Sequence, residues 1–544
     1  MADSQASPSS SYPAHHDAVV VGAGFAGLYA LHRLRGLGLS VRCLDAASGV
    51  GGTWFWNRYP GARCDVESMD YSYSFSPELE QEWVWTERYP AQPEILRYLE
   101  HVADRFDLRR DIRLETRLTR AVFDEQDPGW DLTTDRGESL RARFLVMATG
   151  CLSTARVPDL PGLDSFQGAT YHTGNWPHEG VDFGGRRVGV IGTGSSGTQA
   201  IPLIAAQAAH TTVFQRTANF SLPARNRPLD PAEQRALKAR YREHRAMVRY
   251  SPNGTGRRNN DQSALEVSPE ARRAEYEARW QEGGGGFIGA FNDLLADERA
   301  NDTAADFIRS KIRDIVHDPA VAELLIPRGF PVGSKRVTVD TGYYATYNRD
   351  NVTLVDVGSS PIEKIVPTGV RTADATYELD SIVFATGFDA ITGAVLAVDI
   401  RGRGGRSLRE KWAAGPRTYL GLATAGFPNL FLITGPGSPS VISNMVVSIE
   451  QHVDWIADLL HHARRGGTVC AEADEDAEDT WVAHVNEVAD RTLFPRGASW
   501  YTGANIPGKP RVFMPYVGGV GAYRRHCESI AERGYPGFRF LPGA

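Results

Sequence analysis

Short apolar runs followed by glycine-rich turns occur at two places along the chain. The run Ala18–Val21 ends in Gly22-Ala-Gly24-Phe-Ala-Gly27, and the run Val188–Ile191 ends in Gly192-Thr-Gly194-Ser-Ser-Gly197. Each pattern predicts a buried strand, a tight turn and the start of a helix. In such a unit the glycines let a pyrophosphate approach the helix N-terminus. Two units in one chain therefore predict two bound dinucleotides.

The end of the next strand in each unit indicates which nucleotide binds there. Asp45 ends the second strand of the first unit, where a carboxylate can bind a ribose diol. The second unit ends in Gln215-Arg216-Thr217 and has no acidic residue at that point. Arg216 would pair with a 2′-phosphate that a carboxylate would repel. The second nucleotide is accordingly predicted to be NADP rather than NAD, the alternative being that Arg216 is only a solvent-exposed side chain.

Two later apolar strands indicate how the chain passes between the units. Phe144–Gly150 and Ile382–Gly387 both end in Ala-Thr-Gly, as expected where the chain enters and leaves an inserted nucleotide domain. Between them, Asp230-Pro231-Ala-Glu233 and Ser268-Pro269-Glu270 are typical helix starts. The predicted class is α/β with two Rossmann-like dinucleotide-binding domains, the second of them for NADP, and a helical insert in the second. The expected segments are 18–151 and 388–544 for the first domain, 152–225 and 329–387 for the second, and 226–328 for the insert.

Composition excludes several classes of function. The net charge of −7 over 544 residues offers no basic surface for nucleic acid or anionic membrane, and no apolar run reaches the roughly 18 residues of a membrane span. Residues 1–17 lack the apolar core of a signal peptide and are expected to form a disordered leader. Five scattered cysteines without CxxC spacing argue against a disulfide framework or a metal site and fit a reducing cytoplasm.

The segment between the two glycine-rich turns indicates the reaction. Phe166, Gly168, His172, Trp176 and Pro177 form an FxGxxxHxxxWP pattern. This pattern resembles the fingerprint of Baeyer–Villiger monooxygenases, flavoenzymes that insert one oxygen atom of O2 beside a ketone carbonyl. The similarity extends over almost the whole chain, and within the family it looks strongest to phenylacetone monooxygenases, then to steroid and cyclohexanone monooxygenases. It implies FAD, NADP(H), O2 and a small-molecule ketone that becomes an ester or lactone.

The resemblance also implies roles for three charged residues. In this family a peroxide anion formed on the flavin attacks the ketone, and an anion in a water-poor pocket needs a fixed cation. Arg336 matches that cation, and Asp65 matches the buried acid that orients it. Lys335 matches the residue that contacts the 2′-phosphate. The alternative for Arg336 is a second phosphate contact beside Lys335.

Other family positions carry weaker expectations. His172 and Trp176 are expected to couple movement of the NADP domain to the flavin site rather than to act as a base. Trp500 is expected to cover the nicotinamide ribose, with packing alone as the alternative. Asp45 stands where the family usually has Glu, so its ribose contact is expected to be looser or water-mediated. A small, apolar loop is expected to contact a hydrophobic ketone, aryl-substituted ketones among them, through Ser440, Val441 and Ile442.

The full set of expected cofactor-binding positions follows from the glycine-rich turns together with the family motifs. It contains Gly22, Gly24, Ala26, Gly27, Asp45, Thr53, Trp54, Phe55, Trp56, Arg63, Cys64, Asp65, Tyr71, Leu118, Thr193, Gly194, Ser195, Ser196, Gly197, Thr198, Gln199, Arg216, Thr217, Lys335, Arg336, Met445 and Trp500.

Two other functions share the predicted nucleotide sites. A flavin monooxygenase that oxygenates soft nitrogen or sulfur atoms uses the protonated flavin peroxide and does not require Arg336. A non-enzymatic FAD- and NADP-binding redox sensor would need no Arg–Asp pair. A flavin disulfide reductase is disfavoured because Cys64 has no neighbouring cysteine. Sulfoxidation is expected as a side activity of the main function, and a monomer or weak homodimer is expected.

Overall fold

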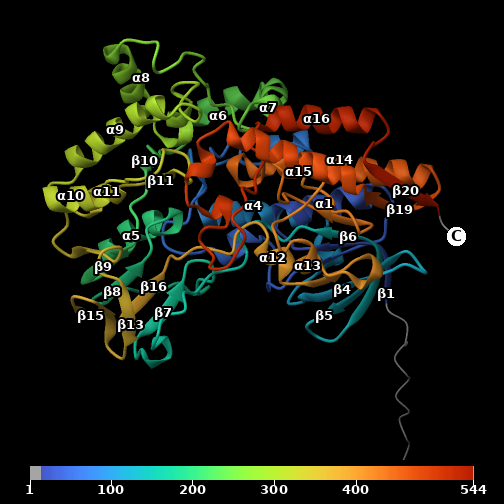
Figure 1. The fold of residues 1–544 in the computed structure, drawn as a ribbon, viewed down its shortest axis with the longest axis horizontal. Coiled ribbons are helices and arrows are strands. Elements are labelled where there is room, and N and C mark those ends of the chain that lie inside the picture. Colours follow the sequence, from blue (N-terminus) through green and yellow to red (C-terminus); the bar gives the residue numbers. More distant parts are fainter. Residues whose placement is uncertain (1–13, 543–544) are drawn as a thin grey trace, which may run out of the picture.

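The computed structural model describes residues 14–542, which fold around two mainly parallel sheets that lie side by side (Figure 1). In the first sheet, β-branched and other apolar residues of the central strands are buried on both faces, as expected for a parallel sheet covered by helices. Its strand order is β17 (Asp399–Arg401), β4 (Leu118–Asp124), β5 (Gly129–Thr134), β6 (Ser139–Met147), β1 (Ala14–Val21), β2 (Val41–Leu44) and β3 (Ile112–Arg113), and β18 (Leu430–Leu432) also pairs with β6.

The first strand begins earlier than the sequence predicts. Residues 14–17, expected to belong to a disordered leader, form the start of β1, where Ala14 and His15 pair with Leu140 and Arg141 of β6. The expectation was wrong for these four positions because pairing with β6 satisfies their backbone, which composition alone does not reveal. The rest of the predicted leader lies outside the described residues.

The second sheet contains five parallel strands from two separate parts of the chain. Its strands come from residues 169–215 and 352–384, and the strands of the first sheet lie outside these ranges. The order is β12 (Val352–Asp356), β9 (His210–Gln215), β8 (Arg187–Ile191), β16 (Ser381–Phe384) and β7 (Ala169–His172). A small antiparallel sheet of β13 (Ile362–Val366), β14 (Gly369–Thr372) and β15 (Thr376–Glu378) lies between β12 and β16 in the chain.

A helical segment is inserted between β10 (Ser221–Pro223) and β11 (Thr338–Asp340), which pair with each other. Both predicted helix starts are confirmed, because Asp230 accepts a hydrogen bond from Ala232 N and Ser268 accepts one from Ala271 N. Stacked aromatic rings such as Tyr276 and Phe287 form part of its core. The helices are α6 (Pro231–Lys238), α7 (Tyr241–Tyr250), α8 (Pro269–Glu282), α9 (Glu298–Ile315) and α10 (Pro319–Leu325).

Helices from both ends of the chain cover the first sheet. α1 (Phe25–Gly36) packs against the long α14 (Met445–Arg465), which in turn contacts α16 (Val520–Glu532) (Figure 1). Within residues 14–542, no helix is long and apolar enough to cross a membrane. The remaining larger elements are α2 (Thr53–Trp56), α3 (Pro77–Glu82), α4 (Gln92–Arg105), α5 (Ser195–Gln207), α11 (Tyr343–Thr346), α12 (Gly393–Leu396), α13 (Leu408–Lys411), α15 (Glu475–Asp490) and the hairpin of β19 (Thr468–Ala473) and β20 (Phe538–Pro542).

Candidate active site

The first glycine-rich turn has the shape that a dinucleotide requires. Gly22 has φ +108°, and a Cβ there would lie 2.5 Å from Ala148 O. A Cβ at Gly27 would lie 1.6 Å from Gly22 O, so only glycine allows α1 to approach the turn. α1 begins after Gly24 without a side-chain cap. Its first N–H groups therefore remain available to a pyrophosphate.

The second turn repeats this geometry at the start of α5. Gly192 has φ +109°, and a Cβ at Gly197 would lie 2.3 Å from Gly192 O. Apart from its own and its neighbouring residues, no atom of the described residues lies within 4 Å of a Cβ built at Gly194, which is also the uncapped N-cap of α5. This space above an uncapped helix end fits a second pyrophosphate.

The side chain of Asp45 accepts hydrogen bonds from the backbone of the first turn and of its own loop. Its Oδ2 accepts a hydrogen bond from Ala23 N at 2.5 Å and its Oδ1 accepts one from Ala47 N at 2.7 Å. Burial raises the pKa of Asp45 above its ordinary value, although these bonds oppose the shift. Each oxygen keeps a second lone pair that could accept a hydrogen bond from a ribose hydroxyl. The expected ribose contact stays a prediction.

Arg336 and Asp65 form a close ion pair, which the sequence could propose only through the family resemblance. Arg336 Nη2 lies 2.8 Å from Asp65 Oδ1 and 2.7 Å from Oδ2, and Nε lies 3.1 Å from Oδ2. Nη1 donates to the carbonyl of Val441 at 2.6 Å. All three nitrogens of the guanidinium are thus hydrogen-bonded, while 29% of the side chain stays exposed. The cation is fixed in place and still accessible to a ligand.

The charges of this pair stabilise each other. The carboxylate of Asp65 raises the pKa of Arg336 above its ordinary value despite burial. Burial would raise the pKa of Asp65, but the charge of Arg336 holds it below its ordinary value. Arg257 of the helical segment adds a hydrogen bond to Asp65 O at 2.9 Å. Both groups are therefore charged at neutral pH, as a fixed cation requires.

The block around α2 brings further predicted positions to the first turn. A Cβ at Gly24 would lie 3.3 Å from Gly52 Cα, so the segment that carries Thr53 and Trp54 lies directly over the turn. Trp54 Nε1 donates to Tyr71 OH at 3.1 Å. Burial raises the pKa of the Cys64 thiol, and Cys64, like the other four cysteines, is free. The lone thiol is inert and cannot form the disulfide of a flavin disulfide reductase.

Two cations lie near each other without an acidic partner. Burial lowers the pKa of Lys335, and the neighbouring charge of Arg216 lowers it further. Lys335 Nζ lies 4.2 Å from the centre of the Phe330 ring. Among the described residues, neither Lys335 nor Arg216 forms an ion pair with a carboxylate. Two close, unneutralised cations beside α5 fit the 2′-phosphate of NADP.

Gln199 and Arg63, both predicted to contact a cofactor, instead contact each other between α5 and the loop that follows α2. Gln199 of α5 accepts a hydrogen bond from Tyr59 OH at 2.8 Å and donates to Arg63 O at 3.1 Å. The Arg63 guanidinium pairs with Glu87. A Cβ at Gly61 would lie 2.5 Å from Gln199 O, so the two parts approach closely here. The polar groups of Gln199 and Arg63 are engaged within the protein, which argues against their serving mainly as nucleotide ligands.

The fingerprint segment also connects the two parts. Gly174 N donates to His172 Nδ1 at 2.9 Å, so the other ring nitrogen carries the proton and donates to Arg156 O at 3.1 Å. Burial lowers the pKa of His172. Trp176 is 3% exposed, and its backbone N donates to Trp56 O at 3.3 Å. Both ring nitrogens of His172 are engaged in hydrogen bonds within the protein, which is consistent with a connecting role and argues against a role as a base.

The expected substrate loop is only partly accessible. Ser440 is fully buried, and its hydroxyl lies 3.0 Å from Cys151 Sγ and 3.2 Å from Thr434 O. This argues against the expected contact of the Ser440 side chain with substrate. Ile442 and Met445 are partly exposed, whereas Val441 is buried and contributes its carbonyl to Arg336. Leu118 is likewise buried in the core of the first sheet, so its side chain does not reach a cofactor.

Two residues near the cation were not predicted. The Tyr501 ring lies 4.4 Å from Trp500, between centres, and its hydroxyl interacts with Arg336. Tyr501 directly follows the predicted Trp500 in the sequence, and this position could have indicated it. Arg257, in contrast, lies in an irregular loop between α7 and α8, and no local pattern points to Asp65.

Known proteins resemble this chain over nearly its full length. A chain described as a Baeyer-Villiger monooxygenase from Pseudooceanicola batsensis is 47% identical, with 96% of each chain covered. A structure of oxidized steroid monooxygenase bound to NADP matches with a TM-score of 0.94 and 58% identity, covering 97% of this chain and all of the other. The chain belongs to the Baeyer–Villiger monooxygenase family. It is therefore an oxidoreductase that binds FAD and NADP, and both cofactors fit the two glycine-rich turns.

Two further comparisons refine this picture. The family model for pyridine nucleotide-disulphide oxidoreductases matches residues 19–272, which include both turns. A phenazine N-monooxygenase from Lysobacter antibioticus is 45% identical, with 96% of this chain and 97% of that one covered. A protein named for nitrogen oxygenation is thus about as similar to this chain as the Baeyer-Villiger monooxygenase from Pseudooceanicola batsensis.

Proposed function

We propose that this Baeyer–Villiger monooxygenase uses NADPH and O2 to convert hydrophobic ketones, aryl-substituted ketones among them, to esters or lactones. The observation that carries the proposal is the Arg336–Asp65 pair, fixed by the carbonyl of Val441 and still partly exposed. FAD, when bound, supplies the activation of O2 for transfer to the substrate. The protein must then stabilise negative charge on oxygen.

Arg336 supplies that stabilisation without moving a proton. A guanidinium stays charged, and one held by three partners needs no reorganisation when an anion develops beside it. The same cation serves first the oxygen nucleophile and then the oxyanion that forms from the ketone carbonyl. Asp65 holds the guanidinium of Arg336 in one orientation. Its negative charge also makes the ion pair neutral overall, so that the site does not bind unrelated anions tightly.

Lys335 and Arg216 orient the reductant. Their neighbouring positive charges would pair with a 2′-phosphate, which NADPH has and NADH lacks. Trp500, whose ring is tilted against that of Tyr501, covers the nicotinamide ribose in this proposal. These contacts set which nicotinamide binds and leave the oxygen chemistry to Arg336.

The partly exposed Ile442 and Met445 form the apolar side of the substrate loop. An apolar wall favours ketones with large hydrocarbon groups, because each buried CH2 contributes about 0.8 kcal/mol of transfer free energy. Small linear ketones should accordingly bind less tightly. The protein is further expected to act as a monomer or weak homodimer in the cytoplasm.

The decisive experiment supplies FAD-bound enzyme with NADPH, 18O2 and separate aryl, cyclic and steroid ketones. We expect esters or lactones that carry one 18O atom, detected by gas chromatography and mass spectrometry. NADPH consumption that yields only hydrogen peroxide with every ketone would contradict the proposal.

A second candidate is oxygenation of nitrogen or sulfur, favoured by the similarity to a phenazine N-monooxygenase. Soft atoms are attacked by a protonated, electrophilic oxidant, which needs no neighbouring cation. Arg336→Ala should then retain phenazine or thioanisole oxidation while losing ester formation. If nitrogen oxidation is the main activity, phenazines should be turned over faster than every ketone by the unaltered enzyme.

A further inference from the structure

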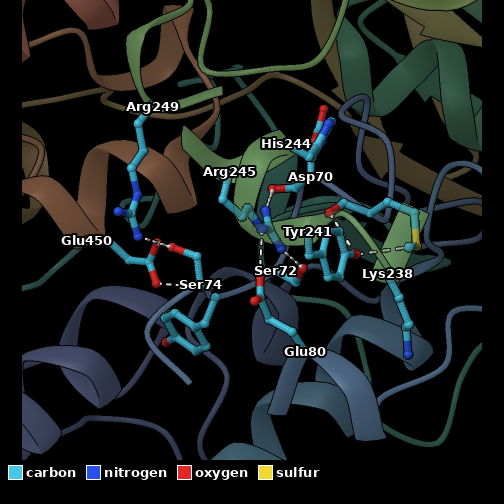
Figure 2. A network of polar contacts seen from close by, with 12 residues as sticks. Asp70, Ser72, Ser74, Glu80, Lys238, Tyr241, His244, Arg245, Arg249 and Glu450 are labelled. Carbon is cyan, nitrogen blue, oxygen red and sulfur yellow. Dashed lines mark hydrogen bonds and ion pairs between the residues drawn. The ribbon is translucent and has the colours of Figure 1, made fainter. Parts of the chain in front are cut away.

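Asp70 connects three parts of the molecule that are far apart in the sequence. It follows the flavin-side block that contains Asp65, and its side chain points toward α7 of the helical insert (Figure 2). Asp70 Oδ1 lies 2.6 Å from His244 Nε2, and Oδ2 accepts a hydrogen bond from Gly256 N at 2.8 Å. Because a carboxylate can only accept, His244 Nε2 is the donor. The carboxylate therefore holds both ends of the insert segment 244–256.

The backbone carbonyl of Asp70 continues the connection to α14. Asn444 Nδ2 donates to Asp70 O at 2.8 Å, and Asn444 Oδ1 caps α14 by accepting from Val446 N at 3.1 Å. The insert contacts the same residue directly, since Asn444 N donates to Asn253 O at 2.9 Å. A Cβ at Gly254 would lie 3.3 Å from Asn444 Cβ. Asn444 is thus enclosed by Asp70 on one side and by the insert loop on the other.

Asn444 in turn ends the loop that holds the catalytic cation. Val441, three residues earlier, accepts the hydrogen bond from Arg336 Nη1. Ser440 has φ +44°, a left-handed conformation that is unfavourable for a residue with a side chain. A strained loop keeps such a conformation only while its surroundings hold it, and the Asp70–Asn444 contact is one of the bonds that do so.

The charges around Asp70 keep its carboxylate ionised, so that its hydrogen bonds to the insert persist. Asp70 is 6% exposed. Burial would raise its pKa, but the hydrogen bond and charge of His244 hold that pKa below the ordinary value, with Arg245 contributing. Arg245 also pairs with Glu80 at 2.7 Å, and the nearby Glu450 is bonded by Ser74 (Figure 2). A buried carboxylate needs these partners, so removal of His244 leaves it undercompensated.

We propose that Asp70 and His244 are positioning residues for Arg336, which they reach through Asn444 and the Val441 carbonyl. The inference rests on the proposed function in taking Arg336 as the catalytic cation. Without His244, the segment 251–256 can move away from Asn444, and the loop 440–444 then loses its contacts with this segment. Arg336 then keeps Asp65 but no longer has a fixed partner for Nη1, so the cation is present but poorly oriented.

The test uses FAD-bound enzyme and compares His244→Ala with two matched variants. His244→Gln keeps a side-chain N–H that can reach Asp70. Lys238→Met removes a different bond between the insert and the flavin side, because Lys238 Nζ donates to Gln81 O at 2.8 Å and not to Asp70. Hydrogen exchange of the amides of residues 442–446 is measured in the resting protein. Ester formation, flavin reduction by NADPH and the KM for NADPH are measured separately.

Loss of one charge-assisted hydrogen bond should raise amide exchange at 442–446, and lower kcat for ester, by about tenfold in His244→Ala. Flavin reduction and the KM for NADPH should change by less than about twofold. His244→Gln should restore most of both losses, and Lys238→Met should resemble the unaltered enzyme in both.

Unchanged exchange in His244→Ala would overturn the proposal, as would an equal rise in Lys238→Met, which would show that the insert merely loosens. Ester loss accompanied by an equal loss of flavin reduction would also overturn it. If the unaltered enzyme forms no ester from any ketone, the proposed function fails, while the exchange measurement still decides whether His244 orders this loop. His244 is partly exposed, so its variants should fold even if Asp70→Asn does not.

Discussion

Replacement of Arg336 by Ala tests the catalytic assignment most directly. The change removes the hydrogen bonds to Asp65 and the one to the Val441 carbonyl, together with the positive charge that pairs with Asp65. Lys335 and Arg216, the residues proposed to bind NADPH, are left unchanged. We therefore expect separate effects on stability, flavin reduction and oxygen transfer.

The stability effect should be moderate. Breaking a fully buried ion pair costs about 3–5 kcal/mol, whereas an exposed pair contributes about 0–1 kcal/mol. The Arg336 and Asp65 side chains are 29% and 23% exposed, so the loss should lie between these limits, at about 1–3 kcal/mol. This loss leaves the protein folded at 25 °C, because native domains are stable by about 5–15 kcal/mol.

The catalytic effect should be larger. Removing one fixed donor to an oxyanion costs about 3–4 kcal/mol, or about 10²–10³ in kcat, and Arg336 also carries a full charge. Ester formation should therefore fall by at least about 10²-fold, while flavin reduction by NADPH stays measurable because hydride transfer creates no charge at this guanidinium.

Anaerobic stopped-flow measurement of flavin reduction and chromatography of the ester separate the two steps. Arg336→Lys is the matched variant, since it keeps the charge but cannot bind Asp65 through a fork. Ester formation by Arg336→Ala within about tenfold of the unaltered enzyme would refute the assignment. Loss of flavin reduction to the same extent as ester formation would place Arg336 in the NADP site instead.

Three further outcomes are expected. Lys335→Ala should raise the KM for NADPH with little effect on NADH, because the neighbouring cations Lys335 and Arg216 are proposed to pair with the 2′-phosphate; equal use of both nucleotides by the unaltered enzyme would contradict this. Ile442→Phe should lower kcat/KM for bulky ketones more than for small ones, and equal losses would show that Ile442 does not face substrate. The folded-state pKa of Asp65 is below its ordinary value of about 3.9, so the ion pair stabilises the protein above that pH and loses its effect as pH falls through the folded pKa. The difference in unfolding free energy between the unaltered protein and Asp65→Asn should therefore shrink at low pH, and a constant difference would argue against ionised Asp65.

Local patterns were sufficient for the nucleotide turns and the family. Gly22 and Gly192 occupy left-handed conformations that residues with a Cβ disfavour, so their identity follows from the turn and can be read without tertiary context. The helix starts at Asp230 and Ser268 were predictable for the same reason, because a cap bonds within its own first turn. Pairing of Arg336 with Asp65, which are 271 positions apart, was reached only through family resemblance.

Only the tertiary structure decided what each polar group contacts. The sequence patterns that suggested nucleotide or substrate contacts for Gln199 and Ser440 carry no information about which distant side chain or carbonyl fills their hydrogen-bonding capacity. The link from His244 through Asp70 to Asn444 joins three segments separated by more than 170 positions. Hydrogen bonds within a turn depend on local backbone geometry, whereas bonds between segments depend on how sheets and helices pack, and that packing is set by the whole chain.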